Sequence, residues 1–164
     1  MLVTYFFNFV YFIIFLIIND KFDTILIMDK KIKNVLILCT GNSCRSIIAE
    51  ALINKEFNKT IKAYSSGVKA SGKVNPNAKK ILKENDCWND EYHSKVIEDV
   101  LSIEYDLVVT VCDNAKESCP IFPNNTKVIH VGFEDPDGKK FEYFSKTYSD
   151  IKKILLPMVY AKLT

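Results

Sequence analysis

The hydrophobic residues of this chain fall into short runs and helical stripes that alternate from residue 28 onward. Continuous apolar runs bounded by turn residues are typical of strands buried on both faces of a sheet. The run at 35–39 predicts one such strand, the β-branched run at 105–111 predicts another, and further strands are predicted at 61–68 and 127–131. Apolar residues at helical spacing, with starting residues such as Ser46 and Pro76, predict helices at 46–57, 76–85, 94–101 and 144–161. Pro157 is expected to kink or end the last helix.

The alternation of strands and helices indicates right-handed βαβ units. We therefore predict an α/β fold with a four-stranded parallel sheet and helices on both faces, in three layers. Ligands in such folds bind beyond the carboxyl ends of the strands. Cys39 ends one predicted strand and Cys112 comes directly after another, so both thiols are expected at the ligand-binding edge of the sheet.

Residues 1–27 differ from the rest of the chain. From Leu2 to Ile18, 15 of 17 positions are apolar, and residues 1–19 hold no charged side chain. One interpretation is a misassigned start, because Met28 opens a short charged leader that precedes the first predicted strand. The alternative is a membrane anchor, since about 17 apolar residues is the shortest stretch that spans a bilayer. We expect residues 28–164 to be the working domain, with no membrane contact unless residues 1–27 are translated.

Composition narrows the classes of function. The chain of 164 residues has 22 Lys and Arg against 20 Asp and Glu, a net charge of +2 that gives no broad basic field for nucleic acid. With 48% hydrophobic residues, the chain can bury a core. Five cysteines are too few for a disulfide scaffold, and their odd number favours reduced, reactive thiols. We expect a cytoplasmic globular protein, a monomer, without a nucleic-acid partner.

A cysteine at a strand end, five further residues, an arginine and a helix start make up residues 39–46, which we call the oxyanion loop. A loop of this kind directs successive backbone N–H groups and the dipole of the following helix at one point. The Arg45 side chain adds a planar fork of donors that suits a tetrahedral oxyanion. The predicted oxyanion-binding residues are Thr40, Gly41, Asn42, Ser43, Cys44, Arg45 and Ser46.

The positive field of this loop is expected to lower the pKa of the Cys39 thiol and to make it a nucleophile at neutral pH. Ser46 is placed to hydrogen-bond the Cys39 thiolate. Asn42 is a candidate for a left-handed backbone conformation with a side chain that braces the loop. Cys44 needs no chemical role, so we interpret it as structural.

Two further cysteines, Cys112 and Cys119, are separated by six mostly polar residues. A disulfide needs its two Cα atoms within about 7 Å, so this pair can close if the segment between them forms a loop or a helical turn and shifts. From the residues alone, the site is an oxyanion-binding cysteine nucleophile with a nearby dithiol.

The run from Val35 to Glu50, Val-Leu-Ile-Leu-Cys-Thr-Gly-Asn-Ser-Cys-Arg-Ser-Ile-Ile-Ala-Glu, resembles the low-molecular-weight protein tyrosine phosphatase superfamily. It is more similar to the thioredoxin-coupled arsenate reductases built on that fold. The resemblance covers residues 33–160, and residues 1–27 have no counterpart in it. Further matching segments are 64–67, 74–76, 93–95, 106–112, 119–120 and 132–136.

This resemblance implies a reaction in three displacements. The Cys39 thiolate attacks arsenate held by Arg45 and the loop amides, while Asp135 in its acid form protonates the departing oxygen. Cys112 then attacks Cys39 and releases arsenite, and Cys119 attacks Cys112 to leave a Cys112–Cys119 disulfide for thioredoxin. Thioredoxin is the implied electron donor, and neither a tightly bound cofactor nor a metal is expected.

Two alternatives to this function stay open. A low-molecular-weight tyrosine phosphatase would use Cys39, Arg45 and Asp135 and would not need the second pair of cysteines. It would normally have aromatic residues near Asp135 to bind phosphotyrosine, whereas Asp135 is followed here by Pro136, Asp137 and Gly138. A membrane-tethered thiol sensor without turnover would require residues 1–27 to be translated.

The remaining candidate residues have smaller roles. Cys87 is expected to be structural, and His93 and His130 lack the spacing of a zinc site. Some relatives bind a potassium ion beside the loop through an Asn, a Glu, a Ser and an Asp. The corresponding residues here are Asn42, Glu50, Ser65 and Lys95. We expect the Lys95 side chain to supply the cation itself.

Overall fold

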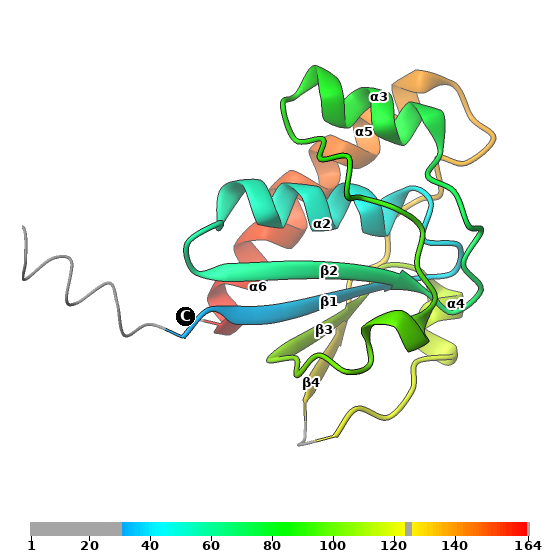
Figure 1. Cartoon of the computed structure of the whole chain (residues 1–164). Helices are drawn as coiled ribbons and strands as arrows, with labels where there is room; N and C mark the ends of the chain where they lie inside the picture. Colours follow the sequence, from blue (N-terminus) through cyan, green and yellow to red (C-terminus); the bar gives the residue numbers. More distant parts are fainter. Residues whose placement is uncertain (1–30, 124–125, 164) are drawn as a thin grey trace, which may run out of the picture. The chain divides into compact units, whose positions relative to one another are not determined.

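The computed structural model describes residues 31–123 and 126–163, and the two interpretations of residues 1–27 lie outside this part. Among the described residues, the strands form one parallel sheet in the order β2-β1-β3-β4 (Figure 1). They are β1 (Lys33–Cys39), β2 (Ile61–Gly67), β3 (Leu107–Thr110) and β4 (Lys127–His130). In the register, Val35 of β1 pairs with Ala63 on one side and with Leu107 on the other. The predicted four-stranded parallel sheet is confirmed.

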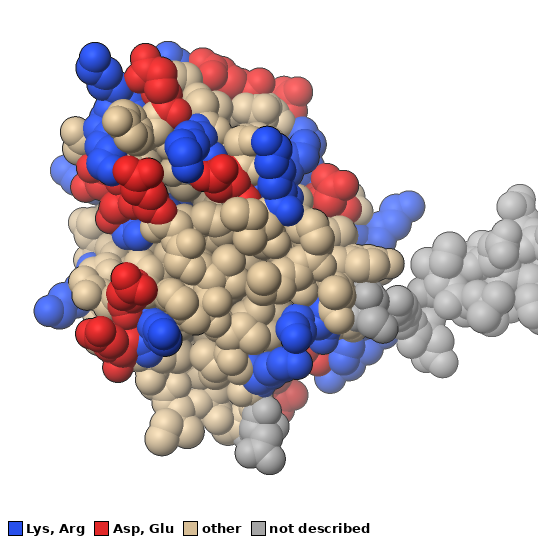
Figure 2. Space-filling view, turned by 180° about the vertical axis from the view of Figure 1, so that it is seen from behind, with Lys and Arg blue, Asp and Glu red and all other residues tan. Residues whose placement is uncertain are grey.

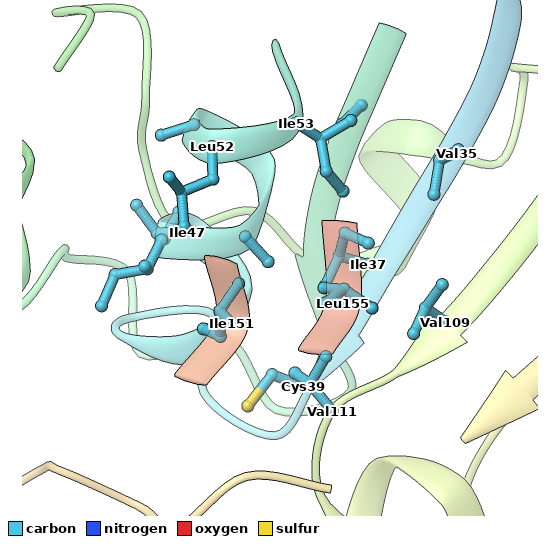
Figure 3. Close-up of a cluster of buried hydrophobic side chains, with 14 of the residues drawn as sticks. Val35, Ile37, Cys39, Ile47, Leu52, Ile53, Val109, Val111, Ile151 and Leu155 are labelled. Atoms are coloured by element: carbon cyan, nitrogen blue, oxygen red, sulfur yellow. The ribbon is translucent and has the colours of Figure 1, made fainter. Parts of the chain in front are cut away.

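One face of the sheet is covered by helix α2 (Arg45–Glu56) and by η2 (Ile151–Leu155), a π-helical segment. Figure 3 shows Ile37 of β1 between side chains from both, among them Ile53 and Leu155. These three side chains are fully buried. Burial of an aliphatic side chain of this size contributes about 1.5–3 kcal/mol, so this layer fixes α2 on the sheet and thereby the oxyanion loop that precedes it.

The opposite face is covered by less regular structure than expected. The predicted helix at 94–101 is wrong, since the structure forms only the 3₁₀ turn η1 (Ile97–Val100) there. Aromatic rings take over the packing: Tyr105 lies edge-on to Tyr64, with 6.0 Å between ring centroids, and edge-on to Phe122 at 6.2 Å. The third layer therefore contains a 3₁₀ turn and an aromatic cluster in place of the short helix expected at 94–101.

The other helices are α3 (Pro76–Glu84), α4 (Asp113–Glu117), α5 (Phe141–Asp150) and α6 (Leu156–Leu163). The last predicted helix is confirmed but begins earlier, at Phe141, and it does not end at Pro157. The π-helical segment η2 widens the helix just before Pro157, where the proline ring would otherwise meet the carbonyl of residue 153. No helix among the described residues is long and apolar enough to cross a membrane.

Charged side chains of both signs are interspersed on the face seen in Figure 2. They gather over the end of the domain that holds α3 and α5, above a broad uncharged area. This face has no field of a single sign.

Candidate active site

The oxyanion loop connects the end of β1 to the start of α2, at the carboxyl edge of the sheet. Four of its carbonyl oxygens accept backbone hydrogen bonds from the segment 68–75. The donors Val68, Lys69, Ser71 and Asn75 bind the oxygens of Cys39, Thr40, Gly41 and Ser43 at 2.8–3.1 Å. Because C=O and N–H point in opposite directions across a peptide plane, this pairing turns the following N–H groups toward the inside of the loop. The first turn of α2 has no side-chain cap, which leaves further N–H groups for an anion.

Asn42 holds the loop in shape. Its backbone has a φ of 46°, the predicted left-handed conformation, and its side chain is fully buried. The Asn42 amide donates to Ser46 Oγ at 3.0 Å and to Ser65 Oγ at 2.8 Å, while its oxygen accepts from the backbone N–H of Lys95 at 2.6 Å. The bracing role is therefore confirmed. The partner predicted for Ser46 is not, because its hydroxyl pairs with Asn42 rather than with the Cys39 thiolate.

A buried ion pair lies behind Asn42. Lys95 Nζ is 3.4 Å from Glu50 Oε2, and the two side chains are only 11% and 7% exposed. Ser65 Oγ donates to the same carboxylate oxygen at 2.6 Å, which connects the pair to Asn42. Burial raises the pKa of Glu50, and the Lys95 charge offsets part of that rise. The Lys95 ammonium group thus lies beside Glu50, at the position where we expected it to supply a cation.

Arg45 is buried at the start of α2, and its guanidinium reaches the loop after β4. It donates to the carbonyl of Phe133 at 3.0 Å and forms an ion pair with Asp135. Its Nε is one of two buried side-chain N or O atoms in the described part of the chain that have no hydrogen-bond partner. An unpaired buried donor costs free energy, and an oxyanion in the loop is the partner that it lacks.

Asp135 therefore makes a contact that its sequence motif does not indicate. The sequence predicts it as the acid that protonates a departing oxygen, whereas in the structure its carboxylate occupies the guanidinium of Arg45. An incoming oxyanion has to compete with Asp135 for these donors. The Asp135 side chain is half exposed, so it can turn away without a rearrangement of the core.

Cys39 and Cys112 are brought together at the ends of the neighbouring strands β1 and β3. Their sulfur atoms are 3.7 Å apart, with Cys39 as donor, and Thr40 Oγ1 is 3.2 Å from the Cys112 sulfur. The hydrogen bond from Cys39 is the main cause that lowers the pKa of Cys112 to about 5, helped by Thr40 and by the N–H of Ala115 in α4.

The predicted lowering of the Cys39 pKa is wrong for this arrangement. Its hydrogen bond to Cys112 and its burial raise the pKa of the Cys39 thiol, and these effects outweigh the opposing charge of Arg45. Two thiols in contact share one proton, since a second negative charge beside the first is unfavourable. Hydrogen bonds from Thr40 and from the Ala115 N–H favour the negative charge on Cys112.

Cys119 is not part of this contact. It follows α4, the short helix between the two cysteines. Cys119 is half-buried, and burial raises the pKa of its thiol. All five cysteines are free thiols.

The other predicted residues behave as structural positions. Cys44 is buried in the loop, and burial raises its pKa to about 12. Cys87 is buried with its sulfur 3.6 Å from the hydroxyl of Tyr148. His93 and His130 belong to no cluster that could hold a metal among the described residues.

Residues 34–161 match the family model described as low molecular weight phosphotyrosine protein phosphatase. The chain belongs to this family. One family relative, "Arsenate reductase 1" of Staphylococcus saprophyticus, is 41% identical over 125 residues, which are 76% of this chain and 93% of the relative.

Solved structures of the same fold include both arsenate reductases and tyrosine phosphatases. The crystal structure of arsenate reductase from Archaeoglobus fulgidus is 30% identical and superposes with a TM-score of 0.65, over 76% of this chain and 98% of that one. A low molecular weight protein tyrosine phosphatase from T. tengcongensis is 27% identical with a TM-score of 0.65, over 80% of this chain and 99% of that one. The resemblance stated from the sequence and the fold class are confirmed.

Two features of this phosphatase-family site were missed by sequence reasoning. Thr40 was assigned only a backbone role, yet its hydroxyl contacts Cys112. Gly67 ends β2 so close to the loop that a Cβ there would lie 2.6 Å from the Thr40 carbonyl oxygen, which leaves room only for glycine. A Gly after Ser-Ser at a strand end is a common turn pattern, and the pattern does not reveal this contact.

Proposed function

We propose that this enzyme reduces arsenate to arsenite, with Cys39, Cys112 and Cys119 as a three-thiol relay and thioredoxin as the electron donor. The observation that supports it most is the 3.7 Å contact between Cys39 and Cys112 beside the oxyanion loop. A phosphatase completes its reaction with water and needs no second thiol. A reductase needs a thiol within reach of the first one, because it must supply two electrons.

In the first displacement, arsenate replaces Asp135 at the Arg45 guanidinium and takes up the loop N–H groups. Cys39 loses its proton to the Cys112 thiolate beside it and attacks arsenic. The sulfur–arsenic bond forms as an arsenic–oxygen bond breaks. Asp135, released from Arg45 and protonated, gives its proton to that oxygen, which leaves as water.

In the second displacement, Cys112 attacks the Cys39 sulfur. A disulfide forms, the sulfur–arsenic bond breaks, and its electron pair stays on arsenic, which is thereby reduced from As(V) to As(III). The proton of Cys112 passes to an arsenite oxygen. Cys119 then attacks Cys112 and frees Cys39, and we propose that the short helix α4 shifts to bring the Cα atoms of the pair within the roughly 7 Å that a disulfide needs. Thioredoxin reduces the Cys112–Cys119 disulfide.

The relatives support the choice of substrate. The named arsenate reductase from Staphylococcus saprophyticus aligns with nearly its whole length. We further propose that residues 28–164 are the working domain, and that it acts in the cytoplasm as a monomer without a tightly bound cofactor.

The function is tested with arsenate and an excess of reduced thioredoxin. The unmodified chain should form arsenite continuously, whereas Cys119→Ser should stop after about one arsenite per chain because its Cys39–Cys112 disulfide is not passed on. Hydrolysis of para-nitrophenyl phosphate should be unchanged in this variant. Cys87→Ser is the matched control. Continuous arsenite formation by Cys119→Ser would contradict the relay.

The second candidate is a phosphatase that uses Cys39, Arg45 and Asp135. The solved tyrosine phosphatase with the same fold favours it. If the chain hydrolyses phosphoesters efficiently and forms no arsenite with thioredoxin, this candidate replaces the first.

A further inference from the structure

Two segments border the oxyanion loop on different sides. The segment 68–75 runs along the loop and pairs with its carbonyl oxygens. The segment 133–137 follows β4 and is tied to the loop through Arg45, which binds the Phe133 carbonyl and the Asp135 carboxylate. These contacts place both segments beside the oxyanion loop.

One side-chain hydrogen bond joins the two segments. The amide nitrogen of Asn75 donates to Asp137 Oδ1 at 2.7 Å, and we call this contact the Asn75–Asp137 bridge. It is charge-assisted, and such hydrogen bonds are about twice as strong as neutral ones. The bridge connects residues 62 positions apart in the sequence, so only the fold brings them together.

Both ends of the bridge are fixed next to the loop. The Asn75 N–H donates to the Ser43 carbonyl, and its side-chain oxygen caps α3 by accepting from Asn77 N–H at 2.8 Å. The Asp137 N–H donates to Asp135 Oδ1 at 3.1 Å. The carboxylate oxygen that accepts from Asn75 is also 3.9 Å from the Cys44 sulfur inside the loop.

We propose that the Asn75–Asp137 bridge is a specificity device that restricts the site to small, unesterified oxyanions by holding the Asp135 segment against the segment 68–75. The inference rests on the proposed function, because it explains why an oxyanion site of this family would act on arsenate rather than on a phosphate ester. Neither residue is a catalytic residue, since neither touches the reacting atoms.

The geometry of the displacement gives the reason. The leaving oxygen departs opposite to the attacking Cys39 sulfur and takes its proton from Asp135. For arsenate this oxygen leaves as water. For an aryl phosphate it carries a ring, which has to extend past Asp135 and therefore past the bridge two residues further on. A closed bridge leaves space for water and crowds the ring.

The charge of Asp137 is a separate effect. A second carboxylate beside the loop disfavours any anion, whether or not it carries a ring. Asp137→Asn retains an oxygen that can accept from Asn75 but removes the charge. Asp137→Ala removes both. Comparison of the two variants therefore separates closure from charge.

The test uses the full chain and measures kcat/KM for para-nitrophenyl phosphate together with arsenite formed per reduced chain. Asp137→Ala should raise kcat/KM for the ester about tenfold, the effect of losing one hydrogen bond that holds the segment closed, and leave the arsenite yield unchanged. Asp137→Asn, which removes the charge but keeps an acceptor for Asn75, should gain clearly less than Asp137→Ala. Asn75→Ser should behave like Asp137→Ala, because serine still caps α3 but is too short to reach Asp137. Glu134→Ala is the control, because Glu134 lies on the same segment as Asp137 and its carboxylate pairs with Lys139 at 2.6 Å.

Two results would overturn the proposal. If Asp137→Ala and Asn75→Ser hydrolyse the ester no faster than Glu134→Ala, the bridge does not restrict the site. If Asp137→Asn gains as much as Asp137→Ala, charge and not closure is responsible. A gain in ester hydrolysis without any arsenite from the unmodified chain would leave the bridge standing and refute the reductase function instead.

Discussion

The two segments that follow β1 and β3 begin alike and are built differently. Each starts with a cysteine at the carboxyl end of a buried strand and leads into a helix, and the two cysteine sulfurs touch. The oxyanion loop after Cys39 is held by four backbone hydrogen bonds and by the buried Asn42 side chain. The segment after Cys112 is a five-residue helix in which only Ala115 is buried.

This difference corresponds to two tasks. An oxyanion must meet donors that are already in position, because every donor that has to be reoriented lowers the gain from binding. In the proposed relay, Cys112 passes the disulfide from Cys39 on to Cys119, with electrons moving in the opposite direction, so this thiol must move. Helices as short as α4 are only marginally stable by themselves, so this segment can unwind at little cost. The rigid and the movable thiol thus stand side by side.

Removal of the nucleophile tests the rigid side of the comparison and should have the largest effect. Cys39→Ser should lower both arsenate reduction and para-nitrophenyl phosphate hydrolysis by at least about a thousandfold, because both reactions begin at this sulfur. Arsenite and nitrophenol are the products to quantify, with Cys87→Ser as the matched control. Arsenite formation that survives in Cys39→Ser would assign the first attack to another thiol.

The ion pair behind the loop comes next. Lys95→Met leaves the Glu50 carboxylate buried and unpaired, which should lower the free energy of unfolding by about 3 kcal/mol. Chemical denaturation measures this, and Lys80→Met, whose ion pair with Glu84 is exposed, is the control.

If Lys95 supplies the cation, potassium salts should not raise the activity of the unmodified chain above that in sodium salts. A marked activation by potassium would contradict this role.

The hydroxyl of Thr40 connects the two segments, and its removal should have a moderate effect. Thr40→Val deletes one of the hydrogen bonds that lower the pKa of Cys112, so that pKa should rise by about one unit, or tenfold in thiolate at acidic pH. The pH dependence of Cys112 alkylation, followed by peptide mass spectrometry, measures it. Thr60→Val is the control. An unchanged pKa would mean that Cys39 and the α4 N–H alone stabilise the thiolate.

Stability as a function of pH tests the proton shared by the two thiols. The folded pKa of Cys112 is about 5, against an ordinary value of 9.0. Between these values the unfolded chain binds the additional proton, so the Cys112 contribution to stability rises with pH from about 5 to 9 and is lost as pH falls through 5. Above 9 the raised pKa of Cys39 reverses the slope. The difference between the unmodified chain and Cys112→Ser should follow this course, and a flat difference would contradict the shared proton.

Much of this architecture could be predicted from local patterns. The four strands, the helix after Ser46 and the left-handed Asn42 depend on apolar runs and residue types that lie next to one another in the sequence. The protonation of Cys39 could not be predicted, because it depends on a sulfur 73 positions away. The Arg45–Asp135 ion pair and the Asn75–Asp137 bridge likewise arise from tertiary contacts. The helix expected at 94–101 gave way to aromatic packing around Tyr105.

The central claim is that Cys39, Cys112 and Cys119 act in sequence on arsenate. The most direct test uses the chain fully reduced and then freed of reductant without air, to which arsenate is added while arsenite is quantified and disulfides are mapped by mass spectrometry. The account predicts about one arsenite per chain, with a Cys112–Cys119 disulfide and a free Cys39. No arsenite and no disulfide, with phosphoester hydrolysis intact, would contradict it.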